Sequence, residues 1–92
     1  MSLTRVDPKD PAETKTYGIN WSKQLNAGAT ILACDWLMPD GLTNAGHSVS
    51  GVYSLVKIAG GEAGQTYDVV NTITTSDGEV LKRTGQLVVA RL

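Results

Sequence analysis

Hydrophobic and polar residues alternate with the period of a β-strand near the start of the chain. Tyr17, Ile19 and Trp21 stand at every second position between residues 16 and 22, with small or polar residues between them. A period of two places these side chains on one face of a strand. We therefore predict a strand over residues 16–22 that buries Trp21 together with Tyr17 and Ile19.

A second strand is predicted over residues 29–37, which are apolar on both sides for much of their length. Its two sides carry Leu32, Cys34 and Trp36, and Ile31, Ala33 and Leu37. We expect the side of Trp36 to be buried. Cys34 on that side should then behave as a small buried hydrophobe, because a thiol among apolar residues is a poor nucleophile.

The β-branched and aromatic content of residues 48–58 predicts two short strands that separate at Gly51. The core side of this stretch is expected to carry Val52, Val56 and Ile58. Residues 42–47, which follow the turn Pro39-Asp40-Gly41, are expected to form a loop or a short strand.

The last two predicted strands cover residues 66–75 and 80–92. The first of them places Tyr67, Val69, Asn71 and Ile73 on one face. Asp77-Gly78 between the strands favours a type I′ hairpin turn. Because no helical period persists for three turns, several short strands with glycine-rich corners predict an all-β sandwich.

Tyr67 enters its strand directly after the glycine turn that ends at Gly64. A tyrosine so placed is typical of the corner of an immunoglobulin-like β-sandwich, where the ring closes the core and the hydroxyl bonds to upstream backbone. Trp36 is expected to be the central tryptophan of that architecture. The predicted fold class is thus an immunoglobulin/fibronectin III-like β-sandwich with an extended N-terminal arm.

The arm is predicted from the first 15 residues, where Pro8 and Pro11 lie among charged side chains. This composition favours an extended, loosely held segment that becomes ordered on a partner. The predicted organisation is an extended N-terminal arm over residues 1–15 and a single β-sandwich domain over residues 16–92.

Length and charge narrow the possible functions. A chain of 92 residues suits one domain. Its formal net charge of −1 comes from interspersed acids and bases, so we expect no nucleic-acid binding. No apolar run approaches the roughly 20 residues that span a bilayer, so we expect no membrane association. A single cysteine excludes an internal disulfide.

Candidate catalytic and metal-binding residues are few. His47 beside Ser48 lacks the orienting acid and the strained nucleophile turn of a hydrolase. Asp7, Asp10 and Glu13 lack the dense ligand spacing of a calcium loop, so solvated charge is the favoured interpretation. The sequence therefore predicts a protein that is not an enzyme, with no catalytic, cofactor-binding or metal-binding residues and no cofactor.

A family resemblance rests on motifs that occur in order along nearly the whole chain. The motifs are Lys9-Asp10-Pro11-Ala12-Glu13, Tyr17 to Trp21, Trp36, Pro39-Asp40-Gly41-Leu42-Thr43, Gly60-Gly61, Gly64, Tyr67, Thr74-Thr75 and Gly78. In these positions the chain resembles a family of short phage and prophage proteins similar to fibronectin type III or immunoglobulin-like domains. The resemblance implies a structural or accessory role in the virion for a protein synthesised in the host bacterial cytoplasm.

Two functional hypotheses follow. The first is a non-enzymatic phage or prophage protein, a virion head or tail component or decoration, that contacts other virion proteins or its own copies. Its contact surfaces would be edge strands, the arm and the apolar side of Ile31 and Leu37. The alternative is a carbohydrate- or host-surface-binding immunoglobulin-like module with polar loops suited to weak glycan binding. A sandwich fold hosts both activities, so the fold does not decide between them.

Overall fold

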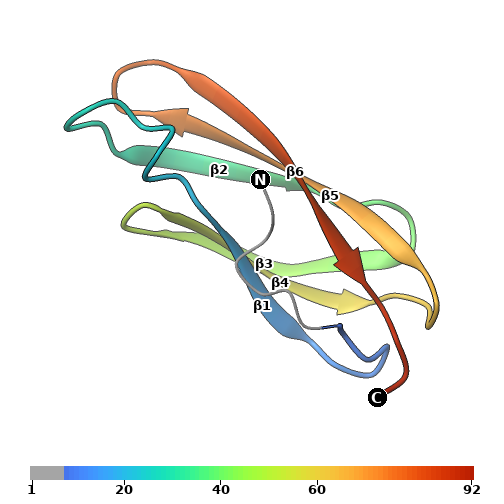
Figure 1. The fold of residues 1–92 in the computed structure, drawn as a ribbon. Helices are drawn as coiled ribbons and strands as arrows, with labels where there is room; N and C mark the ends of the chain where they lie inside the picture. Colours follow the sequence, from blue (N-terminus) through green and yellow to red (C-terminus); the bar gives the residue numbers. More distant parts are fainter. Residues whose placement is uncertain (1–7) are drawn as a thin grey trace.

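Residues 8–92 are described in the computed structural model, and the described chain folds into strands joined by turns (Figure 1). The strands are β1 (Lys15–Asn20), β2 (Ile31–Leu37), β3 (Leu42–Ser50), β4 (Tyr53–Gly60), β5 (Thr66–Thr75) and β6 (Val80–Val88). Each segment predicted to be a strand contains one. Residues 42–47 belong to β3, so the loop alternative for this stretch is wrong.

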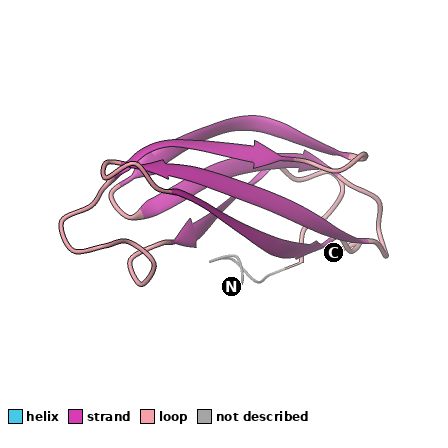
Figure 2. Ribbon diagram, turned by 90° about the horizontal axis from the view of Figure 1, so that it is seen from above, coloured by secondary structure: helices cyan, strands magenta, loops and turns pink. Residues whose placement is uncertain are grey.

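Two antiparallel sheets of three strands each form a sandwich, as Figures 1 and 2 show. Their strand orders are β1-β4-β3 and β2-β5-β6. The prediction of an all-β sandwich is confirmed. The partition matches strands B, E and D and strands C, F and G of an immunoglobulin constant-type domain, although membership of that superfamily stays a prediction.

The core lies between the sheets and takes side chains from all six strands. Its fully buried apolar members include Ile19, Trp21, Ile58, Val69, Ile73 and Val89. The predicted burial of Tyr17, Ile19 and Trp21 on one face is confirmed, as is the burial of Cys34 and Trp36. The Arg83 guanidinium lies 5.6 Å from the centroid of the Trp21 ring and shields its edge of the core.

A register shift corrects the prediction for β2. The pairing of β2 with β5 slips between Ile31 and Ala33, which turns Ile31 into the core and leaves Leu32 67% exposed. One extra residue in a bulge reverses the alternation, so Leu32 and Ile31 exchange the sides that a regular strand would give them. Val52 is also exposed, because it lies in the turn after Gly51 and not in a strand.

The hairpin between β5 and β6 differs in turn type from the prediction. The Gly78 amide donates to the Thr75 carbonyl oxygen over 3.1 Å, and of the turn residues only Gly78 has a positive φ, of 85°. A type I′ turn needs positive φ at both central residues, so that prediction is wrong; this is a type I turn followed by a left-handed glycine. Hydrogen bonds from Thr75 and Asn26 hold the Asp77 side chain and favour this form.

The segment that precedes β1 is attached to the sandwich. Lys9 forms a parallel bridge with Val89: its amide donates to the Val88 oxygen over 2.9 Å, and its carbonyl accepts from the Ala90 amide over 2.8 Å. This contact extends the edge of the β2-β5-β6 sheet beyond β6. The first seven residues of the predicted arm lie outside the described residues. The division of the chain at residue 15 stays a prediction.

Candidate functional site

One end of the sandwich is closed by Tyr67, as the corner motif predicts. The Tyr67 hydroxyl accepts a hydrogen bond of 2.9 Å from the Glu62 amide, five residues upstream. The half-buried ring packs against the core and lies so close to Gly41 that an added Cβ there would be 3.2 Å from the hydroxyl oxygen. The predicted bond from the hydroxyl to upstream backbone is confirmed.

Lys9 completes the same end of the molecule, and sequence reasoning missed this role. Its side chain is fully buried, and its ammonium donates to the carbonyl oxygens of Asp10, over 2.9 Å, and of Gly60. Burial lowers the pKa of the Lys9 amine, against the opposing effect of the carboxylates of Glu13 and Asp10. Nothing in the local sequence separates Lys9 from a surface lysine.

The carboxylates that were considered as calcium ligands are instead bound to backbone amides. The Asp10 carboxylate accepts from the amides of Ala12 and Leu92, both over 2.9 Å, and Glu13 accepts from the Asp10 amide over 2.9 Å. Asp7 lies outside the described residues. Within residues 8–92 no group of three metal-ligating side chains comes together. Asp10 thus links the segment before β1 to Leu92.

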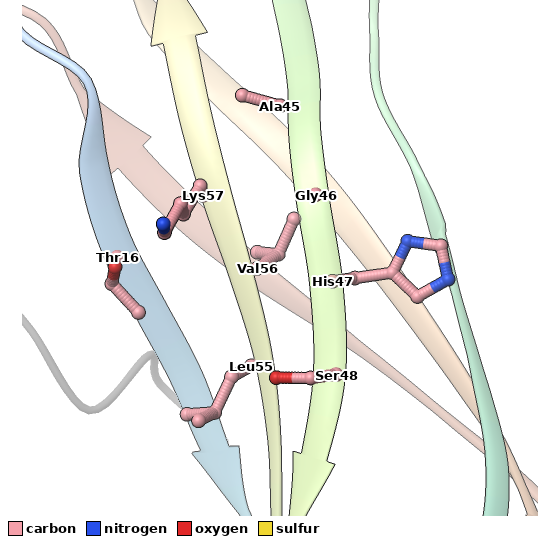
Figure 3. A pocket seen from close by; sticks show the side chains of 8 residues that line it. All are labelled: Thr16, Ala45, Gly46, His47, Ser48, Leu55, Val56 and Lys57. Carbon is pink, nitrogen blue, oxygen red and sulfur yellow. The ribbon is translucent and has the colours of Figure 1, made fainter.

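His47 and Ser48 point to opposite sides of β3. Figure 3 shows the imidazole turned away from Ser48, as alternation along a strand requires. His47 Nδ1 lies 3.1 Å from the side-chain amide nitrogen of Asn44, whose side-chain oxygen accepts from the Gly46 amide over 2.8 Å. Asn44 thus organises the register shift between β3 and β4 at this point. The geometry offers no nucleophile–base pair between His47 and Ser48.

A cavity of about 350 Å³ opens beside this irregularity. Its lining residues are Thr16, Ala45, Gly46, His47, Ser48, Leu55, Val56 and Lys57 (Figure 3). The lining combines an aliphatic floor with hydroxyl groups and one ammonium, and it includes no Trp, Tyr or Phe ring. Sugar sites commonly rest on such rings, so this cavity suits a polar side chain of a protein better than a pyranose.

The thiol of Cys34 is placed where the two sheets meet at their edges. It is buried, and its sulfur lies 3.7 Å from the Ser48 carbonyl oxygen of β3. Burial raises the pKa of the thiol. A raised pKa keeps the thiol protonated at neutral pH, which agrees with the predicted structural role.

β3 is an exposed edge strand, although its Ser48 carbonyl faces Cys34 of β2. Its residues from Ala45 to Ser50 are all exposed, and the strand carries no charged residue and no proline over its nine residues. Edge strands are usually protected by lysine, proline or a short length. In β3 the register shift at Asn44 is the feature that hinders pairing with another chain. The four residues from His47 to Ser50 remain in regular pairing with β4.

Comparisons with known proteins point to one family. A family model described as podophage GP4 fiber-tail adaptor protein gp77 matches residues 9–88. No curated protein matches the chain. Among the described residues there is also no helix of the length and apolar character that crossing a membrane requires.

Proposed function

Because the chain belongs to the podophage GP4 fiber-tail adaptor family, gp77, we propose that it fastens a tail fibre to the tail through protein contacts alone. The protein is a phage structural protein and a component of the virion, made in the host cytoplasm, and it acts through contacts with other virion proteins. Of the locations that the sequence left open, head or tail, the family favours the tail.

The observation that carries this proposal is the extent of the match. Residues 9–88 begin at Lys9 and end at the last residue of β6. These two ends are hydrogen-bonded to each other through the Lys9 amide and the Val88 carbonyl. The match therefore spans Lys9 and all six strands of the sandwich.

The β3 edge supports the contact that such a role needs. An extended segment of a partner can add to an exposed sheet edge by backbone hydrogen bonds, with alternate side chains entering pockets beside it. β3 offers an uncharged edge, and the cavity next to it presents the Lys57 ammonium and the Ser48 hydroxyl. We assign the fibre or the tail protein to this edge, through a segment that places an acidic side chain near Lys57.

The test is reconstitution with the fibre and tail proteins of the same phage. Surface immobilisation of the protein should retain each partner alone and allow a ternary complex with both. Ser50→Lys places a charge in the β3 edge and should weaken one of the two contacts at least about tenfold. Gln86→Lys on β6 serves as the matched control, since it adds the same charge to an exposed strand position elsewhere. If neither partner binds the wild-type protein, the adaptor role is wrong.

A further inference from the structure

The outward side of the β2-β5-β6 sheet combines exposed apolar residues with the charges of Asp35, Lys82 and Asp68. We call it the outer face and define it by Ala33, Asp35, Leu37, Val70, Thr72, Thr74, Val80, Lys82 and Thr84. These residues alternate with the core residues of the same strands. Leu37 and Val80 are 69% and 66% exposed, among the largest values for apolar side chains in residues 8–92.

Strand register arranges the outer face in three rows across the sheet. Asp35 pairs with Thr72, and Thr72 pairs with Lys82, so the two charges lie at the two ends of one row. Two strand spacings, roughly 10 Å, separate them. Neither charge has an ion-pair partner within the described part of the chain.

We propose that a second copy of this chain packs on the outer face, related by a twofold axis that runs along β5. Rotation about that axis places β2 of one copy over β6 of the other. Asp35 of each copy then meets Lys82 of the other, and two interchain ion pairs form at once. A twofold contact is self-complementary, and this row has opposite charges at equal distances from the axis.

The alternative twofold axis, across the strands through Thr72, is disfavoured by the same charges. It would place Asp35 on Asp35 and Lys82 on Lys82, and like charges that face each other oppose association. Along β5, by contrast, the flanking rows also match. Ala33 pairs through Thr74 with Val80, and Leu37 pairs through Val70 with Thr84. The exposed Val80 therefore covers Ala33 of the other copy.

Asp68 is expected to oppose this contact. It lies on the outward side of β5 beyond the last residue of β2 that pairs with that strand, Leu37, and the axis brings it toward Asp68 of the second copy. Removal of this charge should therefore strengthen association, whereas removal of Asp35 should weaken it. Two acidic residues on one face are thus predicted to have opposite effects, which a general charge effect would not produce.

The size of the face predicts a weak dimer. Three strands spaced about 4.8 Å apart, over the seven residues of β2, present roughly 350 Å² per copy. This is below the area of standard stable interfaces. We expect a dissociation constant on the order of 10⁻⁴ M at low salt, weaker at high salt because the ion pairs are at the surface.

Sedimentation equilibrium of the full chain at concentrations up to about 1 mM tests the proposal. Asp35→Lys and Lys82→Asp should each weaken self-association at least about tenfold. An equimolar mixture of the two variants should restore a dimer. The lysine introduced in one variant then faces the aspartate introduced in the other, and the unchanged Lys82 of the first faces the unchanged Asp35 of the second. Asp68→Asn should tighten the wild-type dimer.

Lys57→Asp, on the other sheet, is the control of equal charge change and should leave the dimer intact. A monomer at about 1 mM, a dimer that tolerates both single reversals, or a mixture that stays monomeric would each overturn the proposal. The proposal does not rest on the adaptor role. Failure of the fibre and tail proteins to bind would leave this result standing, and the reverse also holds.

Discussion

The indole nitrogen of Trp21 donates a hydrogen bond of 3.1 Å to the side-chain oxygen of Asn71 and so connects the two sheets inside the core. Ser54 on β4 joins this contact, since its hydroxyl accepts from Trp21 over 3.0 Å and donates to Asn71. The Asn71 amide nitrogen donates to the Asp35 carbonyl oxygen over 2.9 Å. Both the oxygen and the nitrogen of the Asn71 side chain are therefore hydrogen-bonded, and a buried network of this kind fixes how the two sheets meet.

Replacing Asn71 by Leu should lower the free energy of unfolding by about 2–4 kcal/mol. The change leaves the Asp35 carbonyl without its side-chain donor and reduces the Trp21 indole to one acceptor. Ser54→Ala should cost less, about 1–2 kcal/mol, because Asn71 still accepts from Trp21. Thr74→Val, at an exposed position of the same strand, is the control and should stay within about 0.5 kcal/mol. Urea unfolding at low protein concentration measures all three; an Asn71→Leu midpoint equal to wild type would remove the network from the account of stability.

Tyr67→Phe should destabilise the domain by about 0.5–1.5 kcal/mol, because the Glu62 amide loses its acceptor while the ring keeps its packing. The cost should stay below that of a buried unpaired group because the site is half exposed and water can replace the hydroxyl. Tyr53→Phe is the matched control, since that hydroxyl lies at the surface and accepts only a 3.4 Å contact from Asn20. Equal unfolding midpoints for the two variants would show that the ring alone closes this end.

Lys9→Ala should cost about 2–4 kcal/mol, because the Gly60 carbonyl loses a charged donor and the buried stem leaves a void. Lys9→Met keeps the stem and should cost about half as much, which separates packing from hydrogen bonding. Deletion of residues 1–14 removes the same contacts and should destabilise at least as strongly as Lys9→Ala. Thermal unfolding of the three proteins decides whether residues 1–15 form a separable arm: a deletion variant as stable as wild type would support the arm.

The strands could be predicted because the alternation of apolar and polar residues along each strand can be read from the sequence without knowledge of the tertiary structure. Spacing alone shows that one face of the first strand carries Tyr17, Ile19 and Trp21. The Tyr67 corner can be recognised because the tyrosine follows directly after a glycine turn. Leu32 could not be placed, because a bulge is a property of pairing with β5, which lies far away in sequence. The residue pattern within β2 alone does not show where its pairing with β5 shifts.

The role of Lys9 was unpredictable for a related reason. A lysine is among the residues least often buried, and its neighbours Pro8 and Asp10 indicate a surface segment. What buries it is the approach of Gly60 and Val89, which contact it from distant parts of the chain. The candidate contact surfaces share this limit. Strand order makes β3 an edge strand, and strand register places Asp35 and Lys82 in one row.

The acid limit of stability should depend on Asp10. Hydrogen bonds from the amides of Leu92 and Ala12 favour its ionised form and lower the pKa of the carboxyl from its ordinary 3.8 in the folded protein. A group whose pKa is depressed on folding adds stability above its unfolded value, and this stability is lost as pH falls through the folded value. The contribution of Asp10 should therefore be complete near about pH 6 and disappear below 3.8.

Asp10→Asn tests this sign directly. The amide places an N–H group opposite a backbone donor, so the variant should be less stable than wild type at about pH 6. The difference should shrink toward zero as pH falls below 3.8 and the Asp10 carboxyl becomes protonated. Asp40→Asn, an exposed change in the turn before β3, controls for the loss of one negative charge. Urea midpoints measured across this range distinguish the cases. A stability difference between Asp10→Asn and wild type that does not change with pH would contradict this. It would mean that the ionisation of the Asp10 carboxyl contributes nothing to the bond with the Leu92 amide.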